Sequence, residues 1–410
     1  MARAGFLVPL GEGHINPALG LAQALVRRGE AVTMYVDPAW RTRVERIGAA
    51  FSPLASLVRP DRLREAARWP GGIPWAAAEA HLLDWVTGTA EALGPRLRAD
   101  GIDYLVADSA VGLLGAVVSQ HLGVRHIGLC TTFAWTVGLS PLFARRGGGR
   151  NADPGAEQAR AEAVARFQER WRVQPPAFPE GWMELAETVL VFTSRDFQPH
   201  GDRFGARYHF IGPCLGARED GEPAFWQAVE RAASVGGSKR PLLYVALGTL
   251  FNHRPAFWAT CLKAFSDYPG PVVMAVGPHT APEELPAVPP HVVVRPRVPQ
   301  VAVLARAGVF VSHGGMNSVQ EALVHGVPLL LYPLTADQPA VADRVVELGA
   351  GRRIGPDPTP EDLREGVEEL VNEARYRAAA ERIGASLRAA GGCERGAELV
   401  LAFERAHTWH

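Results

Sequence analysis

One stretch of the chain combines a short apolar run with residues that suit a negatively charged ligand: VSHGGMNSVQEALVHGVP, residues 311–328. His313 can donate a hydrogen bond, and the two glycines that follow it let a ligand approach the backbone closely. Asn317 and Ser318 are typical N-cap residues, so the pattern predicts a helix over 319–325. The unpaired N–H groups at a helix start suit a diphosphate. An ordinary turn and helix cap would use the same residues, and this stretch alone leaves both interpretations open.

A second stretch, GEGHINP (residues 11–17), follows the first apolar run. Asn16 and Pro17 are typical of an N-cap and a first helical residue, which predicts that His14 lies in the loop before the helix. Asp108, in YLVADSA, ends a later apolar run of the same predicted sheet. A histidine backed by a carboxylate is a general-base pair, although each residue alone also has a structural explanation.

The glycines around this histidine allow a different interpretation. Gly11-x-Gly13-x-x-Asn16 after a strand, with Asp37 closing the next strand, partly matches the dinucleotide-binding fingerprint of an oxidoreductase. However, asparagine replaces the third glycine, a proline follows at once, and the histidine would crowd the pyrophosphate. The pattern therefore disfavours a dinucleotide site.

Short apolar runs alternate with longer helical patterns along the whole chain. The expected strands are 5–8, 31–36, 103–107, 125–129, 189–193, 208–211, 242–247, 272–276, 292–295, 309–312, 328–332 and 351–354. Strands without internal alternation, separated by helices, indicate parallel sheets covered on both faces. Two such series predict an α/β protein with two doubly wound, Rossmann-like domains.

Turn-rich residues mark the boundary between these domains. We expect an N-terminal domain over 1–213, a linker over 214–239 and a C-terminal domain over 240–385. The helical end of the chain, 386–410, is expected to cross back and brace the first domain.

Composition excludes several classes of function. The 410 residues have a net charge of −1, with 47% hydrophobic and 21% charged residues, so no overall field attracts nucleic acid. The four cysteines form no CxxC pair, which disfavours common zinc and redox motifs and fits a reducing cytoplasm. No apolar run reaches the ~18 residues of a membrane span, and the N-terminal run is too short for a signal peptide. We expect a cytoplasmic protein, either a monomer or a homodimer.

A longer segment carries a resemblance to a known family. RVPQVAVLARAGVFVSHGGMNSVQEALVHGVPLLLYPLTADQP, which contains the stretch described first, resembles the donor-binding signature of family-1 glycosyltransferases. These enzymes have the GT-B fold, and the bacterial macrolide-type members are the most similar. GHINP, FIGP and LYVALGT extend a weaker agreement along the rest of the chain.

The resemblance implies roles for residues that match the family pattern. His313 matches the histidine that contacts the diphosphate, and Glu321 matches the glutamate that binds ribose. Asp337 and Gln338 match the pair that holds sugar hydroxyls, and Thr249 matches a phosphate-contacting position. The remaining expected donor-binding residues are Arg297, Val298, Gln300, Gly315, Asn317 and Ser318.

The chain departs from the family pattern at two donor-site positions. Arg297 stands where a tryptophan commonly stacks on the base, although a guanidinium plane can also stack. Val341 stands where many members have asparagine. The choice between UDP and dTDP is therefore open, and one contact to the donor is expected to be missing.

Aromatic residues of the first domain are candidates for an acceptor pocket. We expect Trp75, Thr132 and Phe133 to contact the acceptor, and Thr131 to meet either the sugar or the acceptor. Trp69, Trp85, Trp135 and Phe143 are further candidates. Burial in the core is the alternative for most of these rings, because tryptophan is largely buried in most proteins.

The resemblance implies an inverting, metal-independent transferase with no cofactor. It would move a hexose from a UDP- or dTDP-sugar to a hydroxyl of a hydrophobic natural product, with His14 as general base supported by Asp108. Its partners would be the nucleotide sugar, bound by the second domain, and a hydrophobic acceptor, bound by the first. Two alternatives remain: a sugar-nucleotide epimerase of GT-B fold, and a non-catalytic nucleotide-sugar-binding helper protein.

Overall fold

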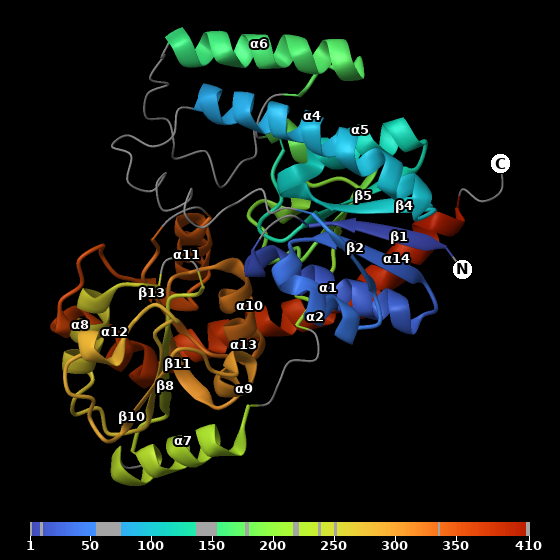
Figure 1. Cartoon of the computed structure of the whole chain (residues 1–410). Coiled ribbons are helices and arrows are strands. Elements are labelled where there is room, and N and C mark those ends of the chain that lie inside the picture. The colour runs from blue at the N-terminus through green and yellow to red at the C-terminus, as the bar shows by residue number, and fades with distance from the viewer. Residues whose placement is uncertain are drawn as a thin grey trace. The chain divides into compact units, whose positions relative to one another are not determined.

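The computed structural model describes residues 2–8, 11–54, 75–136, 154–176, 180–215, 221–236, 239–249, 252–334 and 337–406. The chain divides into two compact units, each with its own parallel sheet (Figure 1). Unit 1 comprises Met1–Gly216 and Ala390–His410, and unit 2 comprises Ala217–Ala389. The expectation of two doubly wound α/β domains is confirmed.

Unit 1 contains a seven-stranded sheet in the order β3-β2-β1-β4-β5-β6-β7. Its strands are β1 (Arg3–Leu7), β2 (Ala31–Val36), β3 (Ala50–Pro53), β4 (Tyr104–Asp108), β5 (Arg125–Cys130), β6 (Thr188–Val191) and β7 (Tyr208–Phe210). All neighbours pair in parallel. Consequently β1, β4 and β5 lie side by side, and their carboxyl ends reach the same edge.

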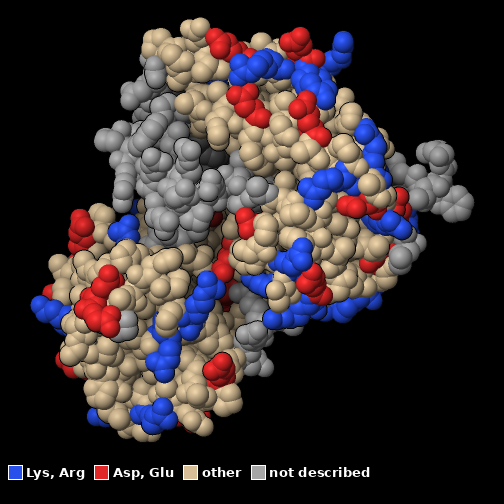
Figure 2. All heavy atoms as spheres, in the orientation of Figure 1, with Lys and Arg blue, Asp and Glu red and all other residues tan. Residues whose placement is uncertain are grey.

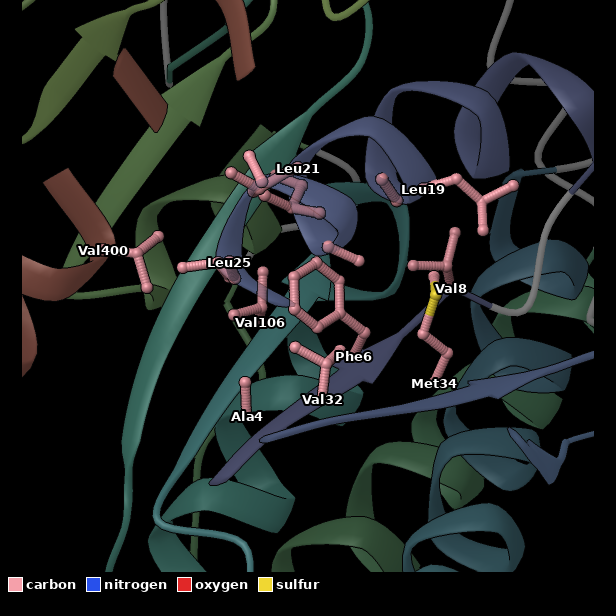
Figure 3. Packing of buried hydrophobic residues seen from close by; sticks show 14 of the residues in the cluster. Ala4, Phe6, Val8, Leu19, Leu21, Leu25, Val32, Met34, Val106 and Val400 are labelled. Carbon is pink, nitrogen blue, oxygen red and sulfur yellow. The ribbon is translucent and has the colours of Figure 1, made fainter. Parts of the chain in front are cut away.

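Helices cover both faces of this sheet. The described α-helices of unit 1 are α1 (Glu12–Arg27), α2 (Arg41–Arg46), α4 (Trp75–Ala99), α5 (Gly112–Leu122), α6 (Pro154–Trp171) and α14 (Gly392–Arg405); short 3-10 helices are η1 (Pro38–Trp40), η2 (Ser109–Val111), η3 (Glu180–Leu185) and η4 (Gly201–Arg203). One core joins Phe6 of β1, Leu25 of α1 and Val400 of α14 (Figure 3). A second core contains Leu105 of β4, Leu93 of α4 and Val117 of α5.

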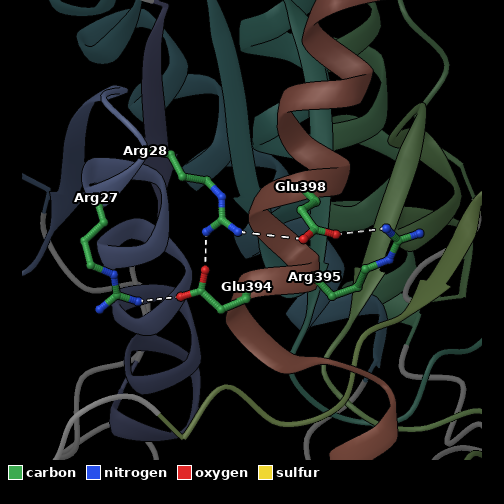
Figure 4. Close-up of polar contacts among 5 residues, drawn as sticks. All are labelled: Arg27, Arg28, Glu394, Arg395 and Glu398. Atoms are coloured by element: carbon green, nitrogen blue, oxygen red, sulfur yellow. Dashed lines mark hydrogen bonds and ion pairs between the residues drawn. The ribbon is translucent and has the colours of Figure 1, made fainter.

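The last helix, α14, packs against α1 although the two are far apart in the sequence. Charged side chains flank this contact (Figure 4): Arg27 Nη2 lies 2.6 Å from Glu394 Oε1, and Arg28 pairs with both Glu394 and Glu398. Arg395 also contacts Glu398, at 3.1 Å. These pairs are largely exposed, so we attribute most of the stability of the contact to the apolar core beneath them.

Unit 2 contains a six-stranded parallel sheet in the order β10-β9-β8-β11-β12-β13. Its strands are β8 (Leu242–Ala246), β9 (Val272–Ala275), β10 (Val292–Arg295), β11 (Ala307–Ser312), β12 (Leu329–Leu331) and β13 (Gly351–Arg353). Its described helices are α7 (Pro223–Gly236), α8 (Pro255–Ala264), η5 (Pro282–Glu284), α9 (Gln300–Leu304), α10 (Met316–Val324), α11 (Gln338–Glu347), α12 (Pro360–Asn372) and α13 (Ala374–Ala389).

The described strands include every strand expected from the sequence, with ends shifted by one or two residues. One strand, β3, was missed. Its four residues, AFSP, are exposed or partly exposed and form no buried apolar run, and β3 forms the edge of its sheet. An edge strand needs no long apolar run, and its proline does not interrupt a central ladder.

Charges of both signs mix on the surface of the protein. On the face shown in Figure 2, Lys and Arg side chains are interspersed with Asp and Glu, including over α4 and α6. Two of the pairs there join these helices: Arg166 lies 3.0 Å from Asp84, and Arg170 lies 2.5 Å from Glu91. The described residues on this face therefore form no extended basic surface of the kind that binds nucleic acid.

Candidate active site

His14 lies in the first turn of α1. The helix begins at Glu12, its N-cap is Gly11, and the backbone N–H of His14 donates to Gly11 O at 3.0 Å. The prediction that Asn16 and Pro17 start the helix was therefore wrong. Asn16 makes no cap because its Oδ1 accepts from Arg43 Nη2 at 2.7 Å, and Pro17 lies inside the helix.

Asp108 is the last residue of β4 and lies beside His14. Its Oδ2 is 2.8 Å from His14 Nδ1, and the carboxylate is fully buried whereas the imidazole is 32% exposed. Asp108 Oδ1 accepts from the backbone N–H of Ala110 at 2.9 Å, at the start of η2. The carboxylate is therefore held at both oxygens, and the parallel pairing of β4 with β1 brings it to the histidine.

Thr131, directly after β5, is a third member of this cluster. Its Oγ1 lies 2.9 Å from the same Nδ1 of His14. Because a carboxylate only accepts hydrogen bonds, the proton of a neutral His14 belongs on Nδ1, and Nε2 is then the basic nitrogen. We expected Thr131 to meet the sugar or the acceptor. Its contact with His14 depends on the order β1-β4-β5, which no local pattern reveals.

The predicted acceptor residues lie in different environments. Thr132 is partly exposed, whereas Phe133 is fully buried and its ring centroid lies 5.5 Å from that of Phe197. Trp75 is the first residue of α4, but its side chain lies outside the described residues, as do Trp69 and Phe143. Their roles stay predictions.

The predicted anion site in unit 2 lies at the start of α10. The N-cap is Gly315 and the helix begins at Met316, so the expectation that Asn317 and Ser318 precede the helix was wrong. Both lie in its first turn, and Ser318 Oγ instead accepts from Gln300 at 3.1 Å. Gly314 has φ +82°, a conformation that favours glycine and turns the chain from β11 into the helix.

His313 lies between two glycines. A Cβ atom at Gly248 would be 2.6 Å from its Nε2, and one at Gly315 would be 2.4 Å away. Burial lowers the pKa of His313 to about 4, so the ring is neutral near pH 7. Its Nδ1 is buried without a hydrogen-bond partner among the described residues. A neutral imidazole offers one N–H donor, which suits an anion next to a helix start.

Gln300, at the start of α9, joins Ser318 and Glu321 of α10. Its Nε2 donates to Glu321 Oε2 at 2.6 Å, and its Oε1 accepts from Tyr244 OH at 3.0 Å. Glu321 is only 1% exposed. The structure therefore brings three predicted donor-binding residues together and adds Tyr244, which the sequence did not identify.

The other predicted donor-binding residues follow strands of the same sheet. Thr249 is exposed after β8, and Arg297 and Val298 lie between β10 and α9. Asp337 is the N-cap of α11, and Gln338, its first residue, accepts from the backbone N–H of Leu334 at 2.8 Å. Because these strands are parallel, their exit loops meet at the edge where α10 begins.

Two kinds of feature do not occur in the described parts of the chain. No group of three or more His, Cys, Asp or Glu side chains there could hold a metal ion. None of the described helices has the length and apolarity needed to cross a bilayer. Unit 1 offers an imidazole oriented by a carboxylate. Unit 2 offers a helix start with a neutral histidine, the buried carboxylate of Glu321 and the partly exposed amide of Gln300.

Known proteins resemble this chain over most of its length. Residues 259–394 match the family described as "Erythromycin biosynthesis protein CIII-like, C-terminal domain". The chain is 32% identical over 397 residues to the uncharacterized UDP-glucosyltransferase YojK of Bacillus subtilis (strain 168), covering 95% of each chain. It is 30% identical over 402 residues to the oleandomycin glycosyltransferase of Streptomyces antibioticus, covering 95% of this chain and 88% of that one. Among solved structures, the calicheamicin glycosyltransferase CalG4 covers 100% of both chains with a TM-score of 0.85 and 27% identity.

Proposed function

Because the chain belongs to the family-1 glycosyltransferases of GT-B fold, we propose that it transfers a hexose to a hydroxyl of a hydrophobic natural product, with inversion at the anomeric carbon. The donor in this proposal is a UDP- or dTDP-sugar. Relatives named for oleandomycin and calicheamicin support an acceptor of this kind, and the relative named a UDP-glucosyltransferase supports a nucleotide-sugar donor.

The hydrogen bond between His14 and Asp108 is the observation that carries the proposal. As the acceptor hydroxyl attacks the anomeric carbon, Nε2 of His14 takes the hydroxyl proton. The Asp108 carboxylate, 2.8 Å from Nδ1, stabilises the positive charge that then forms on the ring. Attack from the face opposite the diphosphate converts an α-linked donor into a β-glycoside.

The leaving group needs stabilisation because negative charge grows on the diphosphate as the bond to the sugar breaks. The start of α10 supplies backbone N–H groups and the positive end of the helix dipole. The neutral ring of His313 and the exposed hydroxyl of Thr249 would add donors. These groups support transfer without a bound metal ion.

A product assay tests this proposal. The protein is incubated with UDP-glucose or dTDP-glucose and a panel of phenolic, macrolide and polyketide acceptors, with and without EDTA. We expect an acceptor mass shift of one hexose, unaffected by EDTA, and a β-anomeric proton coupling in the product.

Three outcomes would contradict the proposal. Nucleotide binding without reaction of any acceptor would favour the helper protein. Conversion of the sugar nucleotide itself, without an acceptor, would favour the epimerase. An α-glycoside from an α-linked donor would overturn inversion.

A further inference from the structure

A chain of hydrogen bonds in unit 2 begins at a tyrosine that the proposed reaction does not use. Tyr244 of β8 is 1% exposed, and its ring stacks on Phe310 of the neighbouring strand β11, with centroids 4.6 Å apart and an angle of 12°. From this position its hydroxyl reaches Gln300 Oε1 at 3.0 Å. The Gln300 amide continues to Ser318 at 3.1 Å and Glu321 at 2.6 Å.

Elementary hydrogen-bond chemistry determines the direction of this chain. The Glu321 carboxylate only accepts, so the Gln300 atom 2.6 Å from it must be the NH₂ group. The amide oxygen must then face Tyr244, and the phenol must donate. The opposite orientation of the amide would bring two acceptor oxygens together in a buried site, at a large energetic cost.

The tyrosine is suited to remain a donor. Burial, and to a smaller extent the charge of Glu321, raise the pKa of Tyr244 well above its ordinary value. The phenol therefore keeps its proton near neutral pH. The parallel pairing of β8 with β11 fixes the backbone of Tyr244, so its hydroxyl is aimed at one place, and the stack on Phe310 adds packing around the ring.

We propose that Tyr244 is a positioning residue for nucleotide binding: it fixes the amide of Gln300 and, through it, the Glu321 carboxylate, so that the two side chains accept hydrogen bonds from the sugar hydroxyls of the nucleoside. Gln300 is partly exposed and is the accessible member of the group. This inference rests on the proposed function, because it takes the start of α10 as the nucleotide site.

The test compares nucleotides that differ in one hydroxyl. Isothermal titration calorimetry gives the Kd of whichever of UDP and dTDP binds more tightly, and of its 3′-deoxy counterpart. We expect wild type to prefer the nucleotide with the 3′-hydroxyl by about tenfold. Tyr244→Phe keeps the stacked ring but removes the donor, and should reduce this preference to about twofold or less.

Two further variants separate positioning from stability. Phe310→Leu removes the stacked ring and should lower Tm, yet retain the 3′-hydroxyl preference. Gln300→Leu should lose the 3′-hydroxyl preference as Tyr244→Phe does. The variant that combines Tyr244→Phe with Gln300→Leu should lose no more of this preference than either single variant, because both changes interrupt the same chain of hydrogen bonds.

Each result has a distinct consequence. If Tyr244→Phe keeps the wild-type preference, or weakens the binding of both nucleotides equally, the positioning role of Tyr244 is overturned. The proposal that unit 2 binds a nucleotide is then unaffected. If wild type binds nucleotide without preferring the 3′-hydroxyl, the role of the Gln300–Glu321 pair is overturned. If wild type binds neither nucleotide, the proposed function itself fails.

Discussion

Histidine side chains in this protein differ in chemistry because their surroundings differ. His14 has a buried carboxylate 2.8 Å from Nδ1 and is partly exposed, so it can exchange a proton with a ligand. Burial lowers the pKa of His313 to about 4, so that ring remains neutral and can only donate or accept a hydrogen bond near pH 7. The role of each histidine is set by its neighbours, not by its place in a motif.

At this scale we predict the effect of removing the base. His14→Ala should lower kcat by about 10²–10⁴-fold and change the Kd of UDP or dTDP by less than about twofold, because the ring takes a proton from the acceptor but does not hold the nucleotide. Stopped glycosylation assays and calorimetry measure the two quantities separately. A large loss of nucleotide affinity would show that His14 belongs to the donor site instead.

Asp108→Asn is the companion variant. The amide oxygen can still accept from Ala110, which preserves the start of η2. The amide NH₂ would donate toward Nδ1, which moves the ring proton to Nε2 and removes its basic lone pair. We expect a loss of kcat comparable to that of His14→Ala, with no change in Tm beyond a few degrees.

At the scale of elements, the starts of helices decide where the site residues lie. Both α1 and α10 begin next to a glycine, Gly11 and Gly315, rather than at the asparagine or serine typical of caps. This extends each helix toward the sheet and places His14 in the first turn of α1.

Close packing between helices depends on glycine as well. A Cβ at Gly20 of α1 would lie 2.7 Å from Cys393 Sγ of α14 and 3.3 Å from Cys214 Cβ.

We therefore predict that Gly20→Ala destabilises the protein. Overpacking costs about 1–3 kcal/mol, which exceeds the ~1 kcal/mol that alanine gains over glycine in a helix. Thermal unfolding of wild type and variant measures the change. Gly88→Ala is the matched control, because a Cβ at this exposed position of α4 would meet nothing within 4 Å. The control should gain about 0.5–1 kcal/mol, and equal effects of the two changes would contradict the packing argument.

At the scale of the whole molecule, each unit contains a histidine whose pKa is lowered by desolvation, so that its ring is neutral near pH 7 in the folded chain. His126 of β5 is 3% exposed, neither of its ring nitrogens has a hydrogen-bond partner among the described residues, and burial lowers its pKa to about 4. The pKa of His313 in unit 2 is also lowered by desolvation. In the unfolded chain both histidines bind a proton below pH 6.5, the ordinary pKa, whereas in the folded chain they do not.

Stability should therefore fall as the pH is lowered from about 6.5 to about 4, because the unfolded state binds protons that the folded state excludes. Each histidine contributes a slope of about 1.4 kcal/mol per pH unit in that window. His126→Gln should lower the free energy of unfolding at neutral pH. It should also reduce the slope of this free energy against pH by the contribution of one histidine, about 1.4 kcal/mol per pH unit. Urea unfolding across the pH series measures both. His81→Gln, at an exposed position of α4, should leave the slope unchanged. An unaltered slope in His126→Gln would mean that His126 is protonated in the folded protein.

Local sequence patterns determined the secondary structure and the placement of candidate residues at strand ends. Apolar runs such as 242–247 and 309–312 fall on β8 and β11, whose residues are all buried, because a strand buried on both faces must be continuously apolar. Asp108 and His313 follow such runs directly, and His14 comes shortly after the first run, so their presence at the carboxyl edge of a sheet could be predicted. The edge strand β3 could not, because its four exposed or partly exposed residues form no apolar run.

The tertiary structure alone decided which side chains meet. Thr131 reaches His14 because β5 lies beside β4 and β4 beside β1, although the residues are far apart in the sequence. Tyr244 reaches Gln300 from inside an apolar strand that looks like ordinary core. Strand order follows from burying both faces of each sheet at once, a property of the whole chain. For that reason the residues that could do chemistry were visible in the sequence, but the contacts that orient them were not.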